Sequence, residues 1–288
     1  MIVDFRTRPP FKSWKKLRIW GERPKNPDPV TASGLFQNIE PYRSYEEKSM
    51  DAFMEEMDEA KIDVAVVMGR QAPDFHGNVP AEEVAELVDT YPGRFVGFGG
   101  VSGTDLDAGL KEIDRCVEFG FKGVAFDNGW CDPPMYDDDE RLFPLYEKCS
   151  ELGLIASITS SIYVGPDISY SMPVHIHRVA QRFQDLTIVV PHAGFPWGEM
   201  MCGIAFHRPN IYLIPDIYLN VPNLPGAGAF VRSANSFLSY RLLYASSYPV
   251  RPLGQSLRSF RGLPFDTDEI RDRCSGGNGA RLLGIEKA

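Results

Sequence analysis

Residues 47–69, EKSMDAFMEEMDEAKIDVAVVMG, contain the repeating unit that decides the fold. In the first part of this stretch, three methionines and Phe53 recur at the spacing of one face of a helix. The apolar run at 62–69 follows at once and is typical of a strand buried on both faces. A helix that leads directly into such a strand indicates a parallel sheet covered by helices.

The same alternation runs through the whole chain. Helical patterns and apolar strands alternate from residue 80 onward, and Met1 to Arg6 supplies the first strand. The later strands are expected at 94–100, 121–127, 154–161, 186–192, 211–216 and 241–249. Eight such units predict an α/β fold of the (β/α)8 TIM barrel type. A doubly wound open sheet is the alternative, but the first strand is not followed by a glycine-rich phosphate turn.

Residues 9–45 interrupt this alternation. The segment begins PPFKSWKKLRIWGERPKNPDPV, is rich in proline, basic and aromatic residues, and shows no sustained periodicity. We therefore expect a long loop over or beside the barrel mouth. Residues 1–288 are otherwise expected to form a single barrel domain.

The composition restricts which kinds of partner the protein is expected to bind. The formal net charge of −9 argues against nucleic acid, which needs a concentrated basic surface, and favours a small-molecule substrate. The five cysteines contain no C-x-x-C pair, which fits a reducing cytoplasm. The apolar stretches are too short to span a membrane. A homo-oligomer is permitted by analogy with other barrels.

Four motifs carry a resemblance to a known family. They are DFRTR at 4–8, IVVPHAGFPW at 188–197, RLLYASSYP at 241–249 and GGNGARLLGIEKA at 276–288. In this order they resemble the amidohydrolase-2 family of the amidohydrolase superfamily, which includes proteins similar to aminocarboxymuconate-semialdehyde decarboxylase. The resemblance covers essentially the whole chain. It implies a barrel hydrolase or decarboxylase that holds a divalent metal.

The resemblance breaks at the metal ligands. The family's two histidines on the first strand correspond to Arg6 and Arg8, its histidine on the fifth to Thr159, and its aspartate on the eighth to Ser247. Only His192, on the sixth strand, keeps the residue type of a ligand. Arginine has no lone pair to offer a metal and stays charged. We therefore expect no cofactor, with a non-standard metal site as the alternative.

Such a non-standard site would combine His192 with Asp4 or Asp216. Without a metal, the arginines themselves supply positive charge. Residues two apart on a strand share a face, so Asp4, Arg6 and Arg8 should form a column toward the barrel interior and mouth. Guanidinium groups bind carboxylate or phosphate through paired hydrogen bonds, which indicates an anionic substrate. The alternative is a structural ion network.

Polar residues at other strand ends complete the candidate site. The catalytic candidates are His192, Asp216, Asp127 and Tyr248, and the candidates for substrate binding are Arg6, Arg8, Thr159, Ser247 and Asp4. His192 and Asp216 follow neighbouring strands, so one could act as a general base that the other orients.

These observations predict a hydrolase or lyase of the amidohydrolase-2 type that acts on a small carboxylated metabolite. The reaction is expected to be metal-independent, with arginines replacing the metal. Two alternatives remain open. One is a divergent metal-dependent hydrolase or decarboxylase, and the other is an inactive barrel that binds an anionic metabolite.

Overall fold

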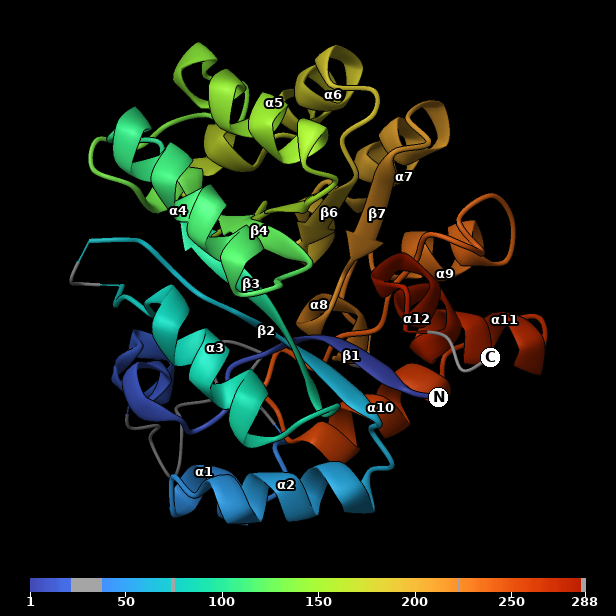
Figure 1. The fold of residues 1–288 in the computed structure, drawn as a ribbon. Coiled ribbons are helices and arrows are strands. Elements are labelled where there is room, and N and C mark those ends of the chain that lie inside the picture. The colour runs from blue at the N-terminus through green and yellow to red at the C-terminus, as the bar shows by residue number, and fades with distance from the viewer. Residues whose placement is uncertain (22–37, 74–75, 222, 286–288) are drawn as a thin grey trace.

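The computed structural model describes residues 1–21, 38–73, 76–221 and 223–285 (Figure 1). Seven regular strands form one parallel sheet in chain order. They are β1 (Val3–Thr7), β2 (Val64–Met68), β3 (Phe95–Val101), β4 (Gly123–Phe126), β5 (Ile155–Ile158), β6 (Ile188–Pro191) and β7 (Ile211–Ile214). Nearly all their residues are buried, as the continuous apolar runs predict.

Residues 241–248 close the barrel between β7 and β1. The N–H of Leu243 donates to the carbonyl of Leu213 on β7 at 2.9 Å, and the N–H of Phe5 on β1 donates to the carbonyl of Tyr244 at 2.9 Å. This segment makes isolated bridges instead of a regular strand, and at Ser247 its backbone leaves the extended conformation with φ 56°. The predicted (β/α)8 barrel is therefore confirmed, with an irregular eighth strand.

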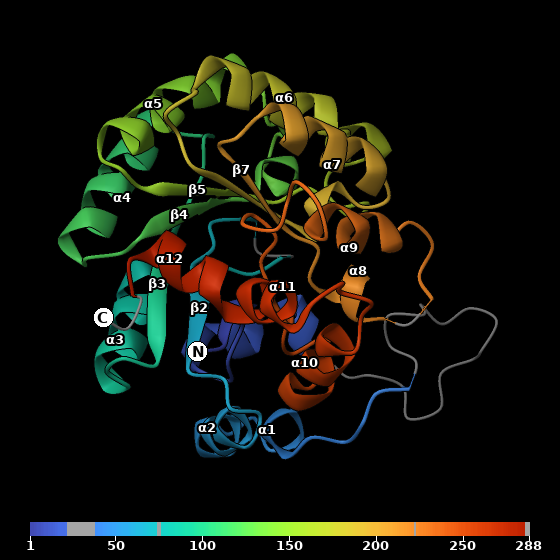
Figure 2. The same ribbon diagram turned by 90° about the vertical axis from the view of Figure 1, so that its right-hand side faces the viewer.

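Helices surround the strands (Figures 1 and 2). They are α1 (Arg43–Glu46), α2 (Met50–Glu59), α3 (Ala81–Thr90), α4 (Leu106–Glu118), α5 (Phe143–Glu151), α6 (Pro173–Arg182), α7 (Gly198–His207), α8 (Ile217–Asn220), α9 (Gly228–Ala234), α10 (Leu253–Arg261), α11 (Asp268–Asp272) and α12 (Asn278–Leu283). α2 begins after Ser49, whose side chain accepts the N–H of Ala52. No helix in the described ranges is both long and apolar enough to cross a membrane.

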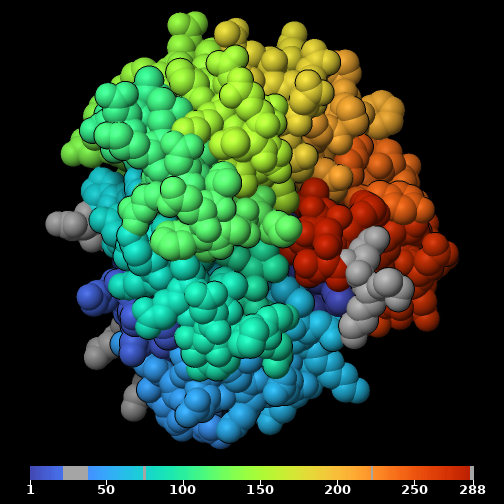
Figure 3. Space-filling view, viewed as in Figure 1, coloured from blue at the N-terminus to red at the C-terminus, as the bar shows by residue number. Residues whose placement is uncertain are grey.

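Two clusters make up most of the core, and a third, small one consists of Ile217, Tyr218 and Val250. The larger cluster lies between strands and helices and includes Phe53 and Met57 of α2, as the helical spacing predicts. A smaller cluster fills the barrel interior and includes Phe5, Val66 and Phe98. α12 packs against this inner cluster, which closes the end of the barrel where the strands begin. The space-filling view shows these red C-terminal residues beside the blue N-terminal ones (Figure 3).

The segment after β1 is more ordered than its sequence suggests. Residues Lys12–Lys16 and Arg18–Trp20 form short 3-10 helices, and Trp14 and Trp20 are buried. The Trp20 ring lies 5.3 Å from the ring of Tyr45. These tryptophans belong to the core and are not exposed, while residues 22–37 of the expected loop lie outside the described residues.

Candidate active site

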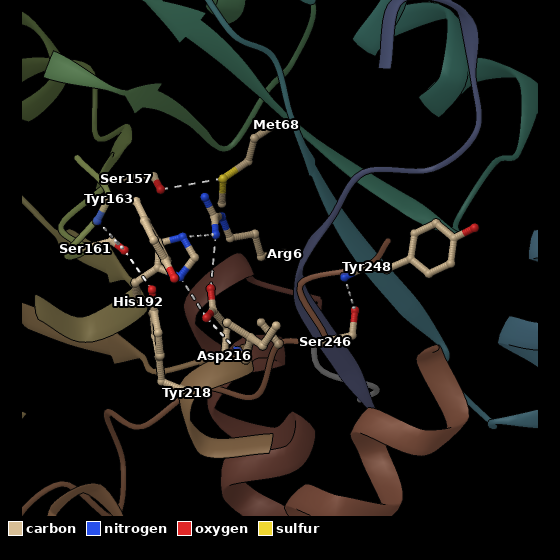
Figure 4. A network of polar contacts seen from close by, with 12 residues as sticks. Arg6, Met68, Ser157, Ser161, Tyr163, His192, Asp216, Tyr218, Ser246 and Tyr248 are labelled. Carbon is tan, nitrogen blue, oxygen red and sulfur yellow. Dashed lines mark hydrogen bonds and ion pairs between the residues drawn. The ribbon is translucent and has the colours of Figure 1, made fainter. Parts of the chain in front are cut away.

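A bulge in β1 decides where its charged residues point. Asp4 and Thr7 of β1 pair with residues of β2, but the register shifts between them. The two residues Phe5 and Arg6 therefore lie opposite the single residue Val66. Phe5 and Val66 both pack in the barrel interior. The bulge lets Arg6 face inward as well, and Figure 4 shows its side chain directed at residues that follow β6 and β7.

Asp4 precedes the bulge and points elsewhere. It lies opposite Ala65, which packs against the helices. Its Oδ1 accepts the backbone N–H groups of Arg6 at 3.2 Å and Ser246 at 2.9 Å, and burial raises its pKa to about 7. The predicted column of Asp4, Arg6 and Arg8 is therefore wrong for Asp4, because the bulge breaks the alternation of the strand. Asp4 holds the closing segment 241–248 in place.

Arg6, His192 and Asp216 form a closed ring of contacts, which we call the closed cluster. Nη1 of Arg6 lies 2.7 Å from Nε2 of His192 and 3.0 Å from Oδ2 of Asp216. Nδ1 of His192 lies 2.9 Å from Oδ1 of Asp216. Since a guanidinium only donates, Nε2 must accept and the imidazole proton belongs on Nδ1. Each nitrogen of the ring and each oxygen of the carboxylate is thus engaged (Figure 4).

The charges in the closed cluster are fixed by burial and by one another. Burial lowers the pKa of His192, and Arg6 lowers it further, although Asp216 opposes both. Burial alone would raise the pKa of Asp216, but His192, Arg6 and the hydroxyl of Ser247 outweigh it and hold it below its usual range. The cluster therefore consists of a neutral imidazole, a carboxylate and a guanidinium.

Three of the candidate site residues have left-handed or related backbone conformations. His192, Asp216 and Ser247 have φ of 65°, 43° and 56°, and each lies at or just beyond the end of its strand. A non-glycine residue with such a φ is uncommon, and each costs about 1–3 kcal/mol. Strain of this kind gathers at functional sites, and the C-terminal ends of the strands are where barrel enzymes carry their chemistry.

Arg8, Arg70 and Asp127 form a second group, which we call the open cluster. Nε of Arg70 lies 3.1 Å from Oδ2 of Asp127, and the Arg70 guanidinium lies 4.6 Å from the centre of the Trp130 ring. Arg8 is partly exposed, and no residue in the described ranges forms a hydrogen bond or ion pair with its guanidinium. Burial and the charges of Arg6 and Arg70 lower the pKa of Arg8, which means that its positive charge is poorly compensated.

Arg70 is a further candidate for the site, and it is absent from the residues predicted from the sequence. It directly follows the apolar strand 62–69, so the rule that selected His192 and Asp216 at strand ends would have selected it too. Tyr218 is a second omission. Its ring meets that of His192 edge to face at 5.4 Å, and its hydroxyl lies 3.0 Å from that of Ser161. Tyr218 lies on α8, and no pattern in the sequence distinguishes it.

Of the remaining candidates, Thr159 and Ser247 lie close to the carboxylates of the site, whereas Tyr248 lies on the helix side of the barrel wall. The hydroxyl of Thr159 lowers the pKa of Asp127 against the effect of burial, and Ser247 lies close to Asp216. Tyr248 points away from the site (Figure 4). It is fully buried beside Phe53 of α2, and its hydroxyl lies 2.8 Å from that of Ser44. This placement does not fit the catalytic role suggested for Tyr248, because the backbone turn at Ser247 directs the next side chain outward.

The donor set does not fit the metal site that the family resemblance implies. The lone pair of His192 Nε2 and an oxygen of Asp216 both converge on Nη1 of Arg6, so the guanidinium lies where a shared cation would have to lie. Among the described residues, no three His, Cys, Asp or Glu side chains gather as metal ligands would. Arginine offers a metal no electron pair.

The solved structures that resemble the fold include the following two. An uncharacterized TIM-barrel protein from Bordetella bronchiseptica shares 36% identity, with a TM-score of 0.89 over 99% of this chain and 98% of that one. A dihydroxybenzoic acid decarboxylase from Polaromonas sp., solved with bound manganese, shares 18% identity, with a TM-score of 0.64 over 86% of this chain and 91% of that one. The second likeness is one of fold alone.

Sequence comparison places the chain in a family. It is 30% identical over 87 residues to 2-amino-3-carboxymuconate-6-semialdehyde decarboxylase of Dictyostelium discoideum, a match that covers 30% of this chain and only 24% of that protein. The sequence model of the amidohydrolase family matches residues 28–285. Since that match takes in most of the barrel, this protein is a member of the amidohydrolase family.

Proposed function

We propose that this protein is a metal-independent lyase that removes a carboxyl group from a small conjugated acid. Family membership supports an enzyme, and one sequence relative and one structure of similar fold are named as decarboxylases. Hydrolysis, which the sequence also suggested, has less support from these relatives.

The observation that carries the proposal is the guanidinium of Arg8, which is paired with no described residue and whose charge Asp127 and Asp216 compensate only in part. In the closed cluster Arg6 is balanced by Asp216, and in the open cluster Arg70 is paired with Asp127. Arg8 has no such partner among the described residues, and both neighbouring arginines disfavour its charge. A substrate anion would relieve this repulsion, so the partly exposed end of Arg8 is where we place it.

The chemistry follows from where charge develops. When the carboxylate is attached to an sp² carbon of the conjugated system, a proton first adds to that carbon and makes it tetrahedral. The bond to the carboxylate carbon then breaks, carbon dioxide leaves, and the electron pair moves through the conjugated system to an oxygen. Arg8 would stabilise that oxygen, and fixed donors of this kind contribute about 10²–10³-fold. His192 can transfer a proton at Nε2 only when Arg6 turns away from it, since Arg6 occupies that nitrogen.

The proposal of metal independence rests on the same contacts. The chemistry that a metal supplies in related enzymes, polarising an oxygen of the substrate, falls here to arginine side chains. Manganese in the Polaromonas enzyme is the finding that argues most directly against this part of the proposal. The two parts of the proposal are therefore tested separately.

The test is a carbon dioxide release assay. Hydroxybenzoic acids and unsaturated keto acids would be incubated with protein purified in chelator, in one arm with EDTA and in the other with Mn²⁺ or Zn²⁺. Equal release in both arms, lost in Arg8→Met, is the expected result. Release only with added metal would overturn metal independence and leave the lyase assignment standing, and the metal content of the active protein would confirm that outcome.

A second candidate function is a barrel that binds an anionic metabolite without turning it over. The observation that favours it is the saturation of the closed cluster, in which His192 has no ring nitrogen free for proton transfer. Ligands that stabilise the protein against heat in an Arg8-dependent manner, yet are recovered chemically unchanged, would favour the binder over the lyase.

A further inference from the structure

We infer that Arg70 is a specificity residue that acts with Arg8 as a second anchor, so that the substrate carries two acidic groups. This inference rests on the proposed function, because it takes the mouth of the barrel as the substrate site. It goes beyond that function by assigning a substrate class, the planar dicarboxylic acids, and a residue that selects it.

The backbone of Arg70 is held by two hydrogen bonds and by a close contact with the neighbouring strand. Its N–H donates to the carbonyl of Val79 at 2.9 Å, and its carbonyl accepts the N–H of Val79 at 2.9 Å. Gly100 on β3 packs directly against it, and a Cβ added at Gly100 would lie only 2.4 Å from the Arg70 nitrogen. A glycine is therefore required opposite Arg70, and the arginine has a fixed starting point.

The side chain of Arg70 is also held, yet part of it has no partner. Asp127 contacts the Nε edge at 3.1 Å, and the indole of Trp130 lies against the guanidinium, whose centre is 4.6 Å from the ring. The Arg70 side chain is only 13% exposed, and its Nη2 is buried without a hydrogen bond to any described residue. Buried donors are almost always satisfied, so a fixed and unsatisfied one indicates a ligand acceptor.

A substrate with two carboxylates fits the geometry of Arg8 and Arg70 better than a substrate with one. β1 and β2 are neighbours in the sheet, so Arg8 and Arg70 emerge side by side beyond the ends of these strands. Their charges repel, and Asp127 moderates that repulsion without hydrogen bonding to Arg8. Each guanidinium presents a fork that matches one carboxylate. A diacid satisfies both forks, whereas a monoacid must leave one unsatisfied or bridge the two.

Binding of matched acids tests the inference without requiring turnover. Benzoate and the three benzenedicarboxylates would be titrated calorimetrically, in EDTA, into wild-type protein and into Arg8→Met and Arg70→Met. We expect one diacid to bind wild type at least about 10-fold more tightly than benzoate, and Arg70→Met to weaken that diacid by about 10- to 100-fold, the range for lost charge-assisted hydrogen bonds. Benzoate should weaken by less than about 3-fold in Arg70→Met, because it needs only Arg8.

Two further variants separate anchoring from indirect effects. Arg70→Met with Asp127→Asn removes both partners of the ion pair, and it should bind the diacid as weakly as Arg70→Met alone. Arg232→Met removes an exposed arginine paired with Glu199 and should bind both acids as wild type does. Recovery of diacid binding in the double variant would overturn the inference, since the loss would then come from an unpaired Asp127.

Equal weakening of benzoate and diacid in Arg70→Met would also overturn it, because both arginines would then hold one carboxylate. So would a wild-type protein with no preference for any diacid. The fate of the proposed reaction is read separately. Tight diacid binding without carbon dioxide release would support the diacid inference and contradict the lyase function. Carbon dioxide release from monoacids alone would support the lyase function and contradict the diacid inference.

Discussion

The closed and open clusters lie at the same end of the barrel and share the same kinds of side chain, but they differ in how completely these are paired. In the closed cluster, Arg6, His192 and Asp216 satisfy one another. In the open cluster, Arg8 has no partner among the described residues and Arg70 has one incomplete contact. The two clusters have similar compositions, but the side chains of the closed cluster satisfy one another, whereas the open cluster needs a ligand to satisfy its donors.

This difference suggests a division of labour. A buried ion pair with all its hydrogen bonds made is costly to break, whereas an unpaired charge is costly to keep. Substitutions in the closed cluster should therefore lower stability first, and substitutions in the open cluster should lower binding and turnover first. Stability and turnover, measured on the same variants of each cluster, test that division.

The largest effect is expected for Asp216→Asn, which breaks the closed cluster. The side chains of Asp216 and Arg6 are 0% and 4% exposed, so the change leaves a buried guanidinium without its counter-charge. We expect unfolding in urea to show a loss of about 3–5 kcal/mol. Asp127→Asn in the open cluster is the matched control and should cost clearly less, because Asp127 and Arg70 remain in contact with solvent. Equal losses of stability in the two variants would contradict the distinction between the closed and the open cluster.

Arg8→Met should produce the opposite pattern. Turnover of the best substrate should fall by about 100-fold or more, as when a donor to a developing oxyanion is removed. Stability should stay within about 1 kcal/mol of wild type or rise, because a charge that is compensated only in part is replaced by an apolar side chain of similar length. Steady-state kinetics and urea unfolding of the same preparation measure both. A large loss of stability with unchanged turnover would assign Arg8 to the structure.

Asp4 extends the comparison to a carboxyl group outside both clusters. Its folded pKa of about 7 lies above the ordinary 3.8, so the folded state holds its proton longer than the unfolded chain does. Stability from this group is therefore present at low pH and is lost as pH rises from about 4 through about 7. Asp4→Asn keeps an oxygen for the N–H groups of Arg6 and Ser246 and should remove this loss, on the order of 2 kcal/mol between pH 5 and pH 8.

Urea midpoints at several pH values measure that slope. Asp216 has the opposite linkage. Its pKa is held below the ordinary value, so its contribution is present above about pH 4 and is lost as pH falls through the folded pKa. An unchanged slope in Asp4→Asn would mean that Asp4 does not titrate in this range.

The sequence predicts the barrel well because periodicity and burial are local signals. Each helix and strand repeats the pattern of residues 47–69, and even the irregular eighth strand was recognisable from its apolar residues. His192 and Asp216 were predicted from the rule that polar residues gather at strand ends, and Arg6 from the family resemblance and the alternation of the first strand.

What the sequence could not supply are the departures from regular geometry. A bulge between Asp4 and Thr7 has no residue signature, and it separates Asp4 from the arginines. The pairing of Arg6 with His192 and Asp216 depends on contacts across more than 180 positions of the chain. Arg70 needed no such knowledge and could have been selected, since it simply follows a strand.

Tyr248→Phe should have the smallest effect and marks the boundary of the site. The change removes one buried hydrogen bond with the hydroxyl of Ser44, so we expect a loss of about 1 kcal/mol in urea unfolding. Turnover and diacid binding should stay at the wild-type level, because the ring lies on the helix side of the barrel wall beside Phe53. Ser247, which precedes Tyr248, lies close to Asp216. A strong loss of turnover in Tyr248→Phe would therefore mean that the Tyr248 side chain turns toward the site during the reaction.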